Sequence, residues 1–370
     1  MNNRKRALAV LNYMDYDRLP IVHFGFLRQT LERWCHEGHI TIEEIDENGM
    51  EGEALGRKLG FDFNWYTVWK SRSPGLLQPQ FERKILDTRT DGSYIVQEPY
   101  GAIVLRKENI HSIPAEMDHI LKDRTSWERE YLPKLEYSQD RLDFEELAAL
   151  CDDSEREYPI GIYCSSLYGE IRNWFGIYGL SYIAVDDEGL YDEIINTVGE
   201  LCYRVTKRAL STGEKFDFGH FWEDICFKNG PLVDPEVFSK KVGPHYRKIT
   251  ELLNGYGINI VSVDCDGCID ALVPIWLDNG VNTMFPIEVG TWGGSIKPWR
   301  EKYGRELRGV GGMDKRVLSA DYAAVDAEIE RLRPLVESGG YIPCPDHRLP
   351  HDVKWENVRY YCERMRQIFC

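Results

Sequence analysis

The sequence lacks long apolar runs, and no window approaches the roughly 18 consecutive apolar residues of a membrane-spanning helix. Residues 1–20 also lack the long apolar core, followed by small residues, that is typical of a secretory signal. We therefore expect a cytoplasmic protein that does not bind a membrane.

Positive charge is also scarce, because 45 lysine and arginine residues stand against 61 aspartate and glutamate residues, which gives a net charge of −16. An acidic chain repels the phosphates of nucleic acids and of anionic lipids. Nucleic acid is therefore not an expected partner. A substrate with many negative charges would need a local cationic pocket.

Internal repeats and low-complexity stretches are absent, and the 32 glycines and 17 prolines are dispersed along the chain. The ten cysteines are scattered too, without the density of a secreted disulfide scaffold. We expect reduced thiols and a single domain over residues 1–370.

Short apolar or β-branched runs alternate with longer segments of helical period. The predicted strands are at 21–26, 61–69, 158–166, 216–222, 258–264, 281–288, 307–314 and 341–346, and the predicted helices include 167–178, 188–211, 235–255, 269–280, 320–336 and 355–368. Eight strands, mostly separated by helices, predict an α/β protein with a single (β/α)₈ TIM barrel. An open doubly wound sheet is the alternative.

Residues 81–110 interrupt this alternation. Their apolar residues have a period of two and are separated by turn residues such as Asp91-Gly92. The pattern predicts an antiparallel β insertion.

Polar residues gather where the predicted strands end. Single residues of this kind are often helix caps, but active sites of barrels lie at the carboxyl ends of the strands. The strand-end residues are His23, Tyr163, His220, Trp222, Glu223, Asp224, Asp264, Cys265, Asp266, Cys268, Glu288, Asp314, Cys344, Asp346 and His347.

Asp264 and Asp266 are two residues apart, so on a strand they share a face, whereas Cys265 points the other way. With Glu288 and either Cys344 or His347 they would offer Zn²⁺ three or four ligands. One alternative is a structural zinc held by Cys265-x-x-Cys268 with Cys344. Another is a site without metal, in which the carboxyl groups transfer protons.

These strand ends resemble the uroporphyrinogen decarboxylase superfamily. The resemblance rests on Leu19-Pro20, Trp222-Glu223-Asp224, Asp264-Cys-Asp266-Gly267, Pro286-Ile-Glu288, Gly312-Met-Asp314 and residues 339–347, and it is strongest over 216–370. It implies the barrel fold. It also implies one of two chemistries: decarboxylation without metal, or zinc-dependent methyl transfer involving a corrinoid protein.

The decarboxylase branch is expected to carry Pro-Val-Trp-x-Met-Arg-Gln-Ala-Gly-Arg, whose arginines hold the carboxylates of a tetrapyrrole. This chain has Arg28 and Arg33 after Pro20, with the first arginine displaced by two positions and no Ala-Gly-Arg. A tetrapyrrole substrate is therefore not expected.

The methyltransferase branch implies a zinc held by His-x-Cys after the fifth strand and by a cysteine at the eighth. Here Asp264 and Asp266 take the first two positions, and Cys344 stands at the third. Carboxylates make the site harder and richer in oxygen, which lowers the preference for zinc. Cleavage of a methyl ether instead needs a Lewis acid or a proton donor at the leaving oxygen.

The resemblance thus implies a corrinoid-dependent methyltransferase, the O-demethylating component, that takes a methyl group from a small methoxylated, possibly aromatic, substrate. Its partner would be a corrinoid-binding protein. A cofactor-free decarboxylase or lyase of a small acid, and a barrel that only binds a ligand, are the alternatives. The expected metal ligands are Asp264, Asp266, Glu288 and Cys344; the expected catalytic residues are Asp266, His347 and Asp224; and the expected substrate-binding residues are His23, Tyr163, Trp222, Glu223 and Asp314.

Overall fold

Each of the eight predicted runs contains a strand in the computed structural model, which describes residues 1–50, 52–66, 75–107, 114–150 and 156–370. All eight strands pair in parallel. They are β1 (Val22–His23), β2 (Phe63–Asn64), β7 (Gly161–Tyr163), β8 (Phe218–Trp222), β11 (Val261–Asp264), β12 (Thr283–Phe285), β13 (Arg308–Met313) and β14 (Tyr341–Pro345).

Six of these strands form one sheet in the order β14-β13-β12-β11-β8-β7, and β1 pairs with β2. The segment after β1 continues the sheet beyond β14, because the Leu27 N–H donates to the Leu349 carbonyl at 3.0 Å and the Leu349 N–H to the Gly25 carbonyl at 3.1 Å. The strands thus follow chain order across the described residues. A doubly wound sheet would reverse that order, so the alternative is wrong.

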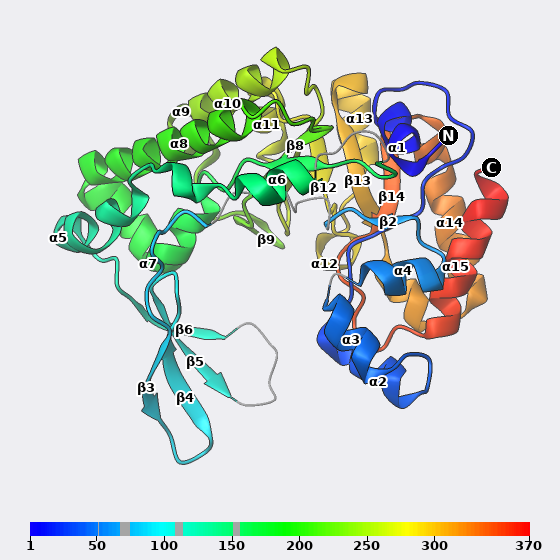
Figure 1. Cartoon of the computed structure of the whole chain (residues 1–370), viewed down its shortest axis with the longest axis horizontal. Coiled ribbons are helices and arrows are strands. Elements are labelled where there is room, and N and C mark those ends of the chain that lie inside the picture. The colour runs from blue at the N-terminus through cyan, green and yellow to red at the C-terminus, as the bar shows by residue number, and fades with distance from the viewer. Residues whose placement is uncertain (51, 67–74, 108–113, 151–155) are drawn as a thin grey trace.

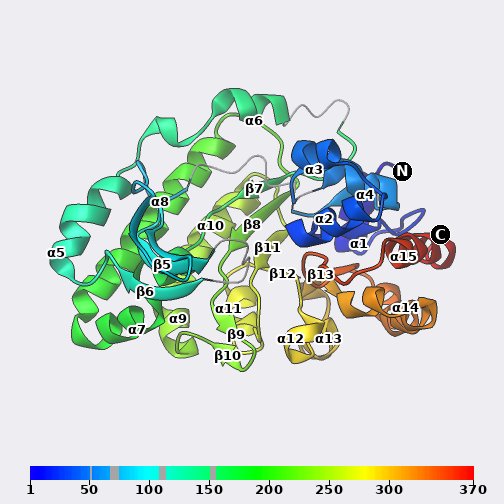
Figure 2. The same cartoon turned by 90° about the horizontal axis from the view of Figure 1, so that it is seen from below.

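Helices lie around the outside of these strands (Figure 2). They are α1 (Asn3–Leu11), α2 (Arg28–His36), α3 (Ile42–Asn48), α4 (Glu53–Leu59), α5 (Arg124–Ser126), α6 (Phe144–Leu150), α7 (Gly169–Asp186), α8 (Glu188–Leu210), α9 (Pro235–Lys241), α10 (Gly243–Gly255), α11 (Val273–Asp278), α12 (Val289–Trp292), α13 (Ile296–Tyr303), α14 (Tyr322–Glu337) and α15 (Trp355–Ile368). Single-turn segments of other helix types occupy Trp127–Tyr131, Leu132–Leu135, Gln139–Arg141, Gly304–Glu306 and Lys315–Ser319.

The helix predicted over 269–280 is shorter in the structure, where α11 covers only Val273–Asp278, and two other predicted helices differ in their course. The helix predicted over 167–178 continues to Asp186 past a kink at Gly176, whose φ is 66°. The helix predicted over 235–255 is two helices, α9 and α10, which meet at Val242. Both differences arise from single backbone positions, which a period of 3.6 residues does not reveal.

Burial explains why these segments form their elements. All four residues of β11 are buried, as expected for a parallel strand covered on both faces. Along α8 the buried residues recur every three or four positions, for example Leu190, Ile194, Val198 and Leu201. The core therefore lies between the strands and one face of each surrounding helix.

The predicted insertion is a four-stranded antiparallel sheet in the order β3-β4-β5-β6. Its strands are β3 (Lys84–Thr88), β4 (Ser93–Gln97), β5 (Ala102–Lys107) and β6 (Ala115–His119), so it reaches beyond residue 110. It projects away from the rest of the molecule (Figure 1). A second, shorter pair is β9 (Cys226–Phe227) with β10 (Gly230–Pro231).

Across the described ranges of the chain, none of the helices is both long enough and apolar enough to cross a membrane.

Candidate functional site

Five predicted site residues come together at the carboxyl ends of β8, β11, β12 and β14. We call Asp224, Asp264, Asp266, Glu288 and His347 the strand-end cluster. The loop after β11 joins its members, because the Gly267 N–H donates to Glu288 Oε2 at 2.7 Å and Asp266 Oδ2 lies 3.5 Å from His347 Nε2. The cluster therefore combines four carboxyl groups and one imidazole from four strand ends.

Asp264 is the most deeply buried carboxyl group of the cluster, with 4% of its surface exposed. Burial raises its pKa well above the ordinary value, and the negative charges of Asp266 and Asp224 raise it further. Arg348 and a hydrogen bond with Tyr66 oppose this shift. We expect Asp264 to keep a proton at a pH at which ordinary aspartates have lost theirs.

Glu288 and Asp224 are shifted in the same direction. Burial raises the pKa of Glu288, and the charge of Asp266 adds to it, although Glu288 also accepts a hydrogen bond from Thr291 Oγ1 at 2.8 Å. Burial and then Asp266 also raise the pKa of Asp224, against an ion pair with Arg172 at 3.2 Å. Burial, and then repulsion from Asp266, thus favours the protonated form of Glu288 and Asp224 as it does for Asp264.

Asp224, Asp266 and His347 are the accessible members of the cluster, with side chains that are 43%, 34% and 33% exposed. Asp266 Oδ1 is itself buried and has no hydrogen-bond partner among the described residues. Asp266 and His347, which lie 3.5 Å apart, are therefore placed to contact a ligand and to exchange a proton with it.

Aromatic rings adjoin the cluster. The ring centroid of Phe24 lies 4.6 Å from that of Phe285, 4.9 Å from that of Tyr66 and 5.3 Å from that of His347. The Arg348 guanidinium lies 5.3 Å from the centre of the Tyr66 ring. An aromatic ligand would find stacking partners next to the acidic groups.

Two predicted substrate-binding residues, Tyr163 and Trp222, lie on the sheet face that carries the strand-end cluster. Tyr163 is in register with His220, and Trp222 is in register with Asp264, so each lies on the same sheet face as its partner. His220 in turn lies 6.2 Å, ring to ring, from Phe285. Both half-buried side chains are therefore on the side of the strand-end cluster.

His23, predicted to bind substrate, does not join the cluster. Its ring lies 4.8 Å from that of Phe61, and a Cβ atom added at Gly56 of α4 would lie 2.3 Å from His23 Nε2, so the side chain points into the helical layer. Burial lowers its pKa to about 3, which keeps the ring neutral. Because side chains alternate along a strand, the next residue, Phe24, faces the site instead.

Glu223 was also predicted to bind substrate, but its carboxylate binds the start of α7. The N–H groups of residues 167, 168 and 169 donate to it at 2.8, 3.0 and 2.8 Å, and the hydroxyls of Ser166 and Tyr246 donate as well. The residue is fully buried. Its oxygens are occupied, so the role is structural.

Asp314 is the third residue that lies apart from the cluster. Its two oxygens accept hydrogen bonds from Arg316 Nε at 2.8 Å and Arg316 Nη2 at 2.7 Å. One of them also accepts from the Arg316 N–H, which caps the short helix Lys315–Ser319. Asp314 is therefore a helix cap, the role that single strand-end residues often have.

The predicted zinc ligands do not form a metal site. Cys344 is fully buried, and burial followed by the charge of Asp346 raises its pKa well above the ordinary value, which disfavours the thiolate that binds zinc. Over the described residues, no three His, Cys, Asp or Glu side chains are arranged to hold a metal ion. Neither Asp264, Asp266, Glu288 and Cys344 nor the cysteines at 265 and 268 with Cys344 form such a group in the described residues.

Several residues of the site were not predicted from the sequence: Phe24, Tyr66, Arg172, Glu170 and Arg348. Burial and then the charge of Glu223 raise the pKa of Glu170 to about 7. Arg348 could have been predicted from the sequence, because it directly follows the predicted site residue His347. Phe24 and Tyr66 lie just after β1 and β2, and Glu170 and Arg172 lie in α7, where nothing in the local pattern separates them from packing residues.

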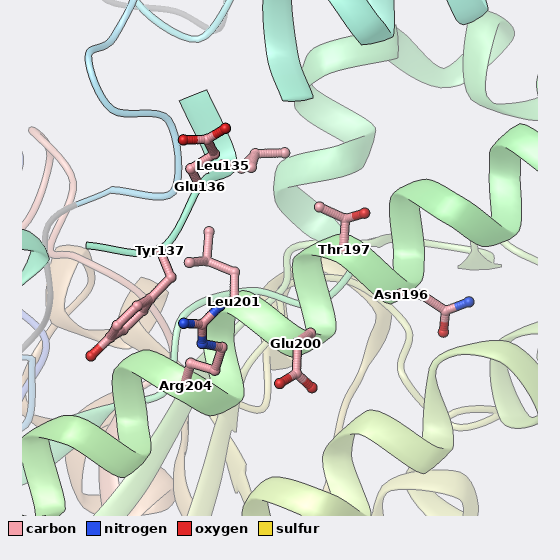
Figure 3. A pocket seen from close by; sticks show the side chains of 8 residues that line it. All are labelled: Leu135, Glu136, Tyr137, Asn196, Thr197, Glu200, Leu201 and Arg204. Carbon is pink, nitrogen blue, oxygen red and sulfur yellow. The ribbon is translucent and has the colours of Figure 1, made fainter. Parts of the chain in front are cut away.

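A cavity of about 610 Å³ lies elsewhere on the molecule. Figure 3 shows the side chains that line it, which come from α8 and from residues 135–137. Arg204 stacks on Tyr137 there at 4.1 Å. The cavity contains no member of the strand-end cluster.

Comparison with known proteins agrees with this fold. No family model and no curated protein matches the chain. Among solved structures, a methyltransferase from Methanosarcina mazei matches with a TM-score of 0.60 and 14% identity over 99% of this chain and 98% of its own. A B12-independent methionine synthase from Shewanella sp. W3-18-1 matches with a TM-score of 0.49 and 11% identity over 95% and 98%.

The chain thus has, over its whole length, an α/β fold of the kind found in that methyltransferase, with a parallel sheet and a small antiparallel sheet. The α/β fold expected from the sequence is therefore confirmed.

Proposed function

We propose that this protein is a methyltransferase that takes a methyl group from a small methoxylated compound and passes it to a corrinoid protein. The observation that carries the proposal is the strand-end cluster, in which an accessible Asp266–His347 pair adjoins three proton-holding carboxyl groups. The fold shared with a methyltransferase supports it.

The proposal includes a closed (β/α)₈ barrel. Beyond β7, the remaining gap would be closed by β2, and the ring of Trp65, directly after β2, stacks on that of Phe218 in β8 at 4.6 Å. Closure would make one mouth of all eight strand ends, as in other barrel enzymes. The cluster would line that mouth.

Demethylation of an ether breaks the bond between oxygen and the methyl carbon, and the electron pair of that bond stays on the oxygen. The oxygen then needs a proton, and a donor placed beside it lowers the barrier. Asp266 and His347 are the groups to deliver this proton, and Asp224, Asp264 and Glu288 are the neighbours that can replace it. A reduced corrinoid carried by the partner protein would supply the nucleophile that accepts the methyl group.

The aromatic surroundings favour an aromatic ether. The ring of Phe24 lies 5.3 Å from that of His347, and the half-buried Tyr163 and Trp222 lie on the same side of the strands. An aromatic leaving group also stabilises the negative charge that develops on its oxygen. The methoxylated substrate is therefore expected to be a small aromatic compound.

The test is turnover with a reduced corrinoid protein and a panel of methoxylated aromatics, followed by chromatography of the demethylated product. Asp266→Asn and His347→Gln should each lower the rate about 100-fold, the usual scale for loss of a general acid. Asp278→Asn, an exposed aspartate outside the cluster, is the control and should keep the rate. Equal rates in all four proteins, or no product across a broad panel, would contradict the proposal.

A cofactor-free decarboxylase or lyase of a small acid is the second candidate, because the Asp266–His347 pair could itself protonate a carbanion. A tetrapyrrole is disfavoured, since Arg28 pairs with Glu32 at 3.0 Å and Arg33 with Glu37 at 3.2 Å on α2. Release of carbon dioxide from small carboxylic acids, lost in Asp266→Asn, would favour this candidate over methyl transfer.

A further inference from the structure

Three arginines surround one tyrosine at the opposite end of the strands from the cluster. The guanidinium carbons of Arg300, Arg305 and Arg308 lie 5.2, 5.0 and 5.8 Å from the centre of the Tyr13 ring. We call these three residues the arginine triad. Arg308 begins β13, and Figure 1 shows α1 and α13 towards this end of β13 and β14, with α12 towards the other.

The triad has no acidic partner. Within the described part of the chain, none of the three arginines forms an ion pair with an aspartate or glutamate, although acidic residues outnumber basic ones by 61 to 45. Residues 296–308 alone contain five lysines and arginines against two glutamates. An uncompensated group of cations is therefore an exception in this protein.

Tyr13 holds the triad together without neutralising it. Its hydroxyl donates to the Leu307 carbonyl at 3.0 Å, and burial raises its pKa, so the ring stays uncharged. Its position depends on close packing, because a Cβ atom at Gly340 would lie 2.3 Å from Tyr13 Cζ. Cation–π contacts with one ring compensate only part of three positive charges.

Several guanidinium donors remain available. Arg300 donates to the Gly339 carbonyl at 2.7 Å, but its Nε is buried without a hydrogen-bond partner among the described residues. Arg308 donates hydrogen bonds from Nε to the Leu11 carbonyl and from Nη1 to the Glu306 carbonyl. Arg305 is exposed and, in the described residues, donates no hydrogen bond.

We propose that the arginine triad is a binding site for a phosphoryl group. A single carboxylate would neutralise one of the three guanidinium groups, whereas a phosphate monoester carries close to two negative charges at neutral pH and presents three oxygens to forked donors. Guanidinium groups match that geometry. The site would lie on the amino-terminal side of the strands, away from the strand-end cluster, and is independent of the proposed methyl transfer.

The experiment is calorimetric titration of the full-length protein at low ionic strength with inorganic phosphate, glycerol phosphate and acetate. Both phosphates should bind saturably and more tightly than acetate. Arg305→Gln should weaken phosphate binding about tenfold, the effect of losing one charge-assisted hydrogen bond. Arg333→Gln, which removes an equal charge from an arginine paired with Glu330, should leave the affinity within about twofold.

Arg308→Lys provides a second variant. It keeps the positive charge but removes the paired N–H donors of the planar guanidinium, so it should also weaken phosphate binding. Melting temperatures of all variants without ligand would show that they remain folded. The proposal is wrong if phosphate shows no saturable heat, if acetate binds as tightly as phosphate, or if Arg305→Gln and Arg333→Gln bind phosphate equally.

Discussion

Glu223→Ala should destabilise the protein strongly, because this one carboxylate joins three parts of the fold. It follows β8, it accepts hydrogen bonds from the N–H groups of residues 167–169 at the start of α7, and it accepts another from Tyr246 in α10. Position 169 requires glycine, because a Cβ atom there would lie 1.9 Å from the Glu223 carbonyl oxygen. Both the side chain and the backbone of Glu223 therefore pack closely against the start of α7.

The size of this destabilisation can be worked out from the buried donors that lose their acceptor in Glu223→Ala. The three N–H groups lose their acceptor in a place where Glu223 has no exposed surface. A buried donor without a partner costs about 1–3 kcal/mol, so the three together should lower the free energy of unfolding by about 3–9 kcal/mol. A domain is stable by only about 5–15 kcal/mol, so a large fraction of the stability would be lost.

Urea unfolding, followed by tryptophan fluorescence, measures this free energy. Glu223→Gln keeps one acceptor oxygen and should lose about half as much. Glu251→Ala changes an exposed glutamate on α10 and should shift the free energy by less than about 0.5 kcal/mol. If Glu223→Ala unfolds at the same urea concentration as Glu251→Ala, Glu223 is not the structural residue described above.

Three other substitutions test separate contacts. Gly169→Ala should abolish soluble folded protein or lower the melting temperature markedly, since the new Cβ would lie 1.9 Å from a backbone oxygen; an unchanged melting curve would contradict this contact. The pKa of Glu170 is raised from 4.5 to about 7, so this residue favours folding below about pH 4.5 and loses that contribution as the pH rises to 7. Glu170→Gln should therefore raise the urea midpoint relative to wild type more at pH 8 than at pH 5, and an equal change at both values would refute the shift. Lys315→Met removes the cation 2.9 Å from the fully buried Asp346 and should cost about 3–5 kcal/mol in urea unfolding, whereas a loss below about 1 kcal/mol would show that the pair is not needed.

The positions of the strands could be predicted from the sequence because they depend on local patterns. The run 258–264, which contains the buried strand β11, is rich in β-branched apolar residues, and the apolar residues of the helices between the strands recur every three or four positions. The carboxyl ends of such strands meet at one edge of the sheet, so Asp264, Asp266 and Glu288 could be expected to lie together.

The direction of single side chains was decided by the tertiary structure. β1 is only two residues long, and the packing of α4 decides that His23 points outward and Phe24 inward. Beyond the end of a strand the alternation of side chains stops: Asp224 has a φ of 47°, and it reaches the cluster while its neighbour Glu223 turns to α7. The same limit applies to the zinc prediction, because the residue types that bind a metal are visible in a sequence, whereas their distances depend on how separate strands pack.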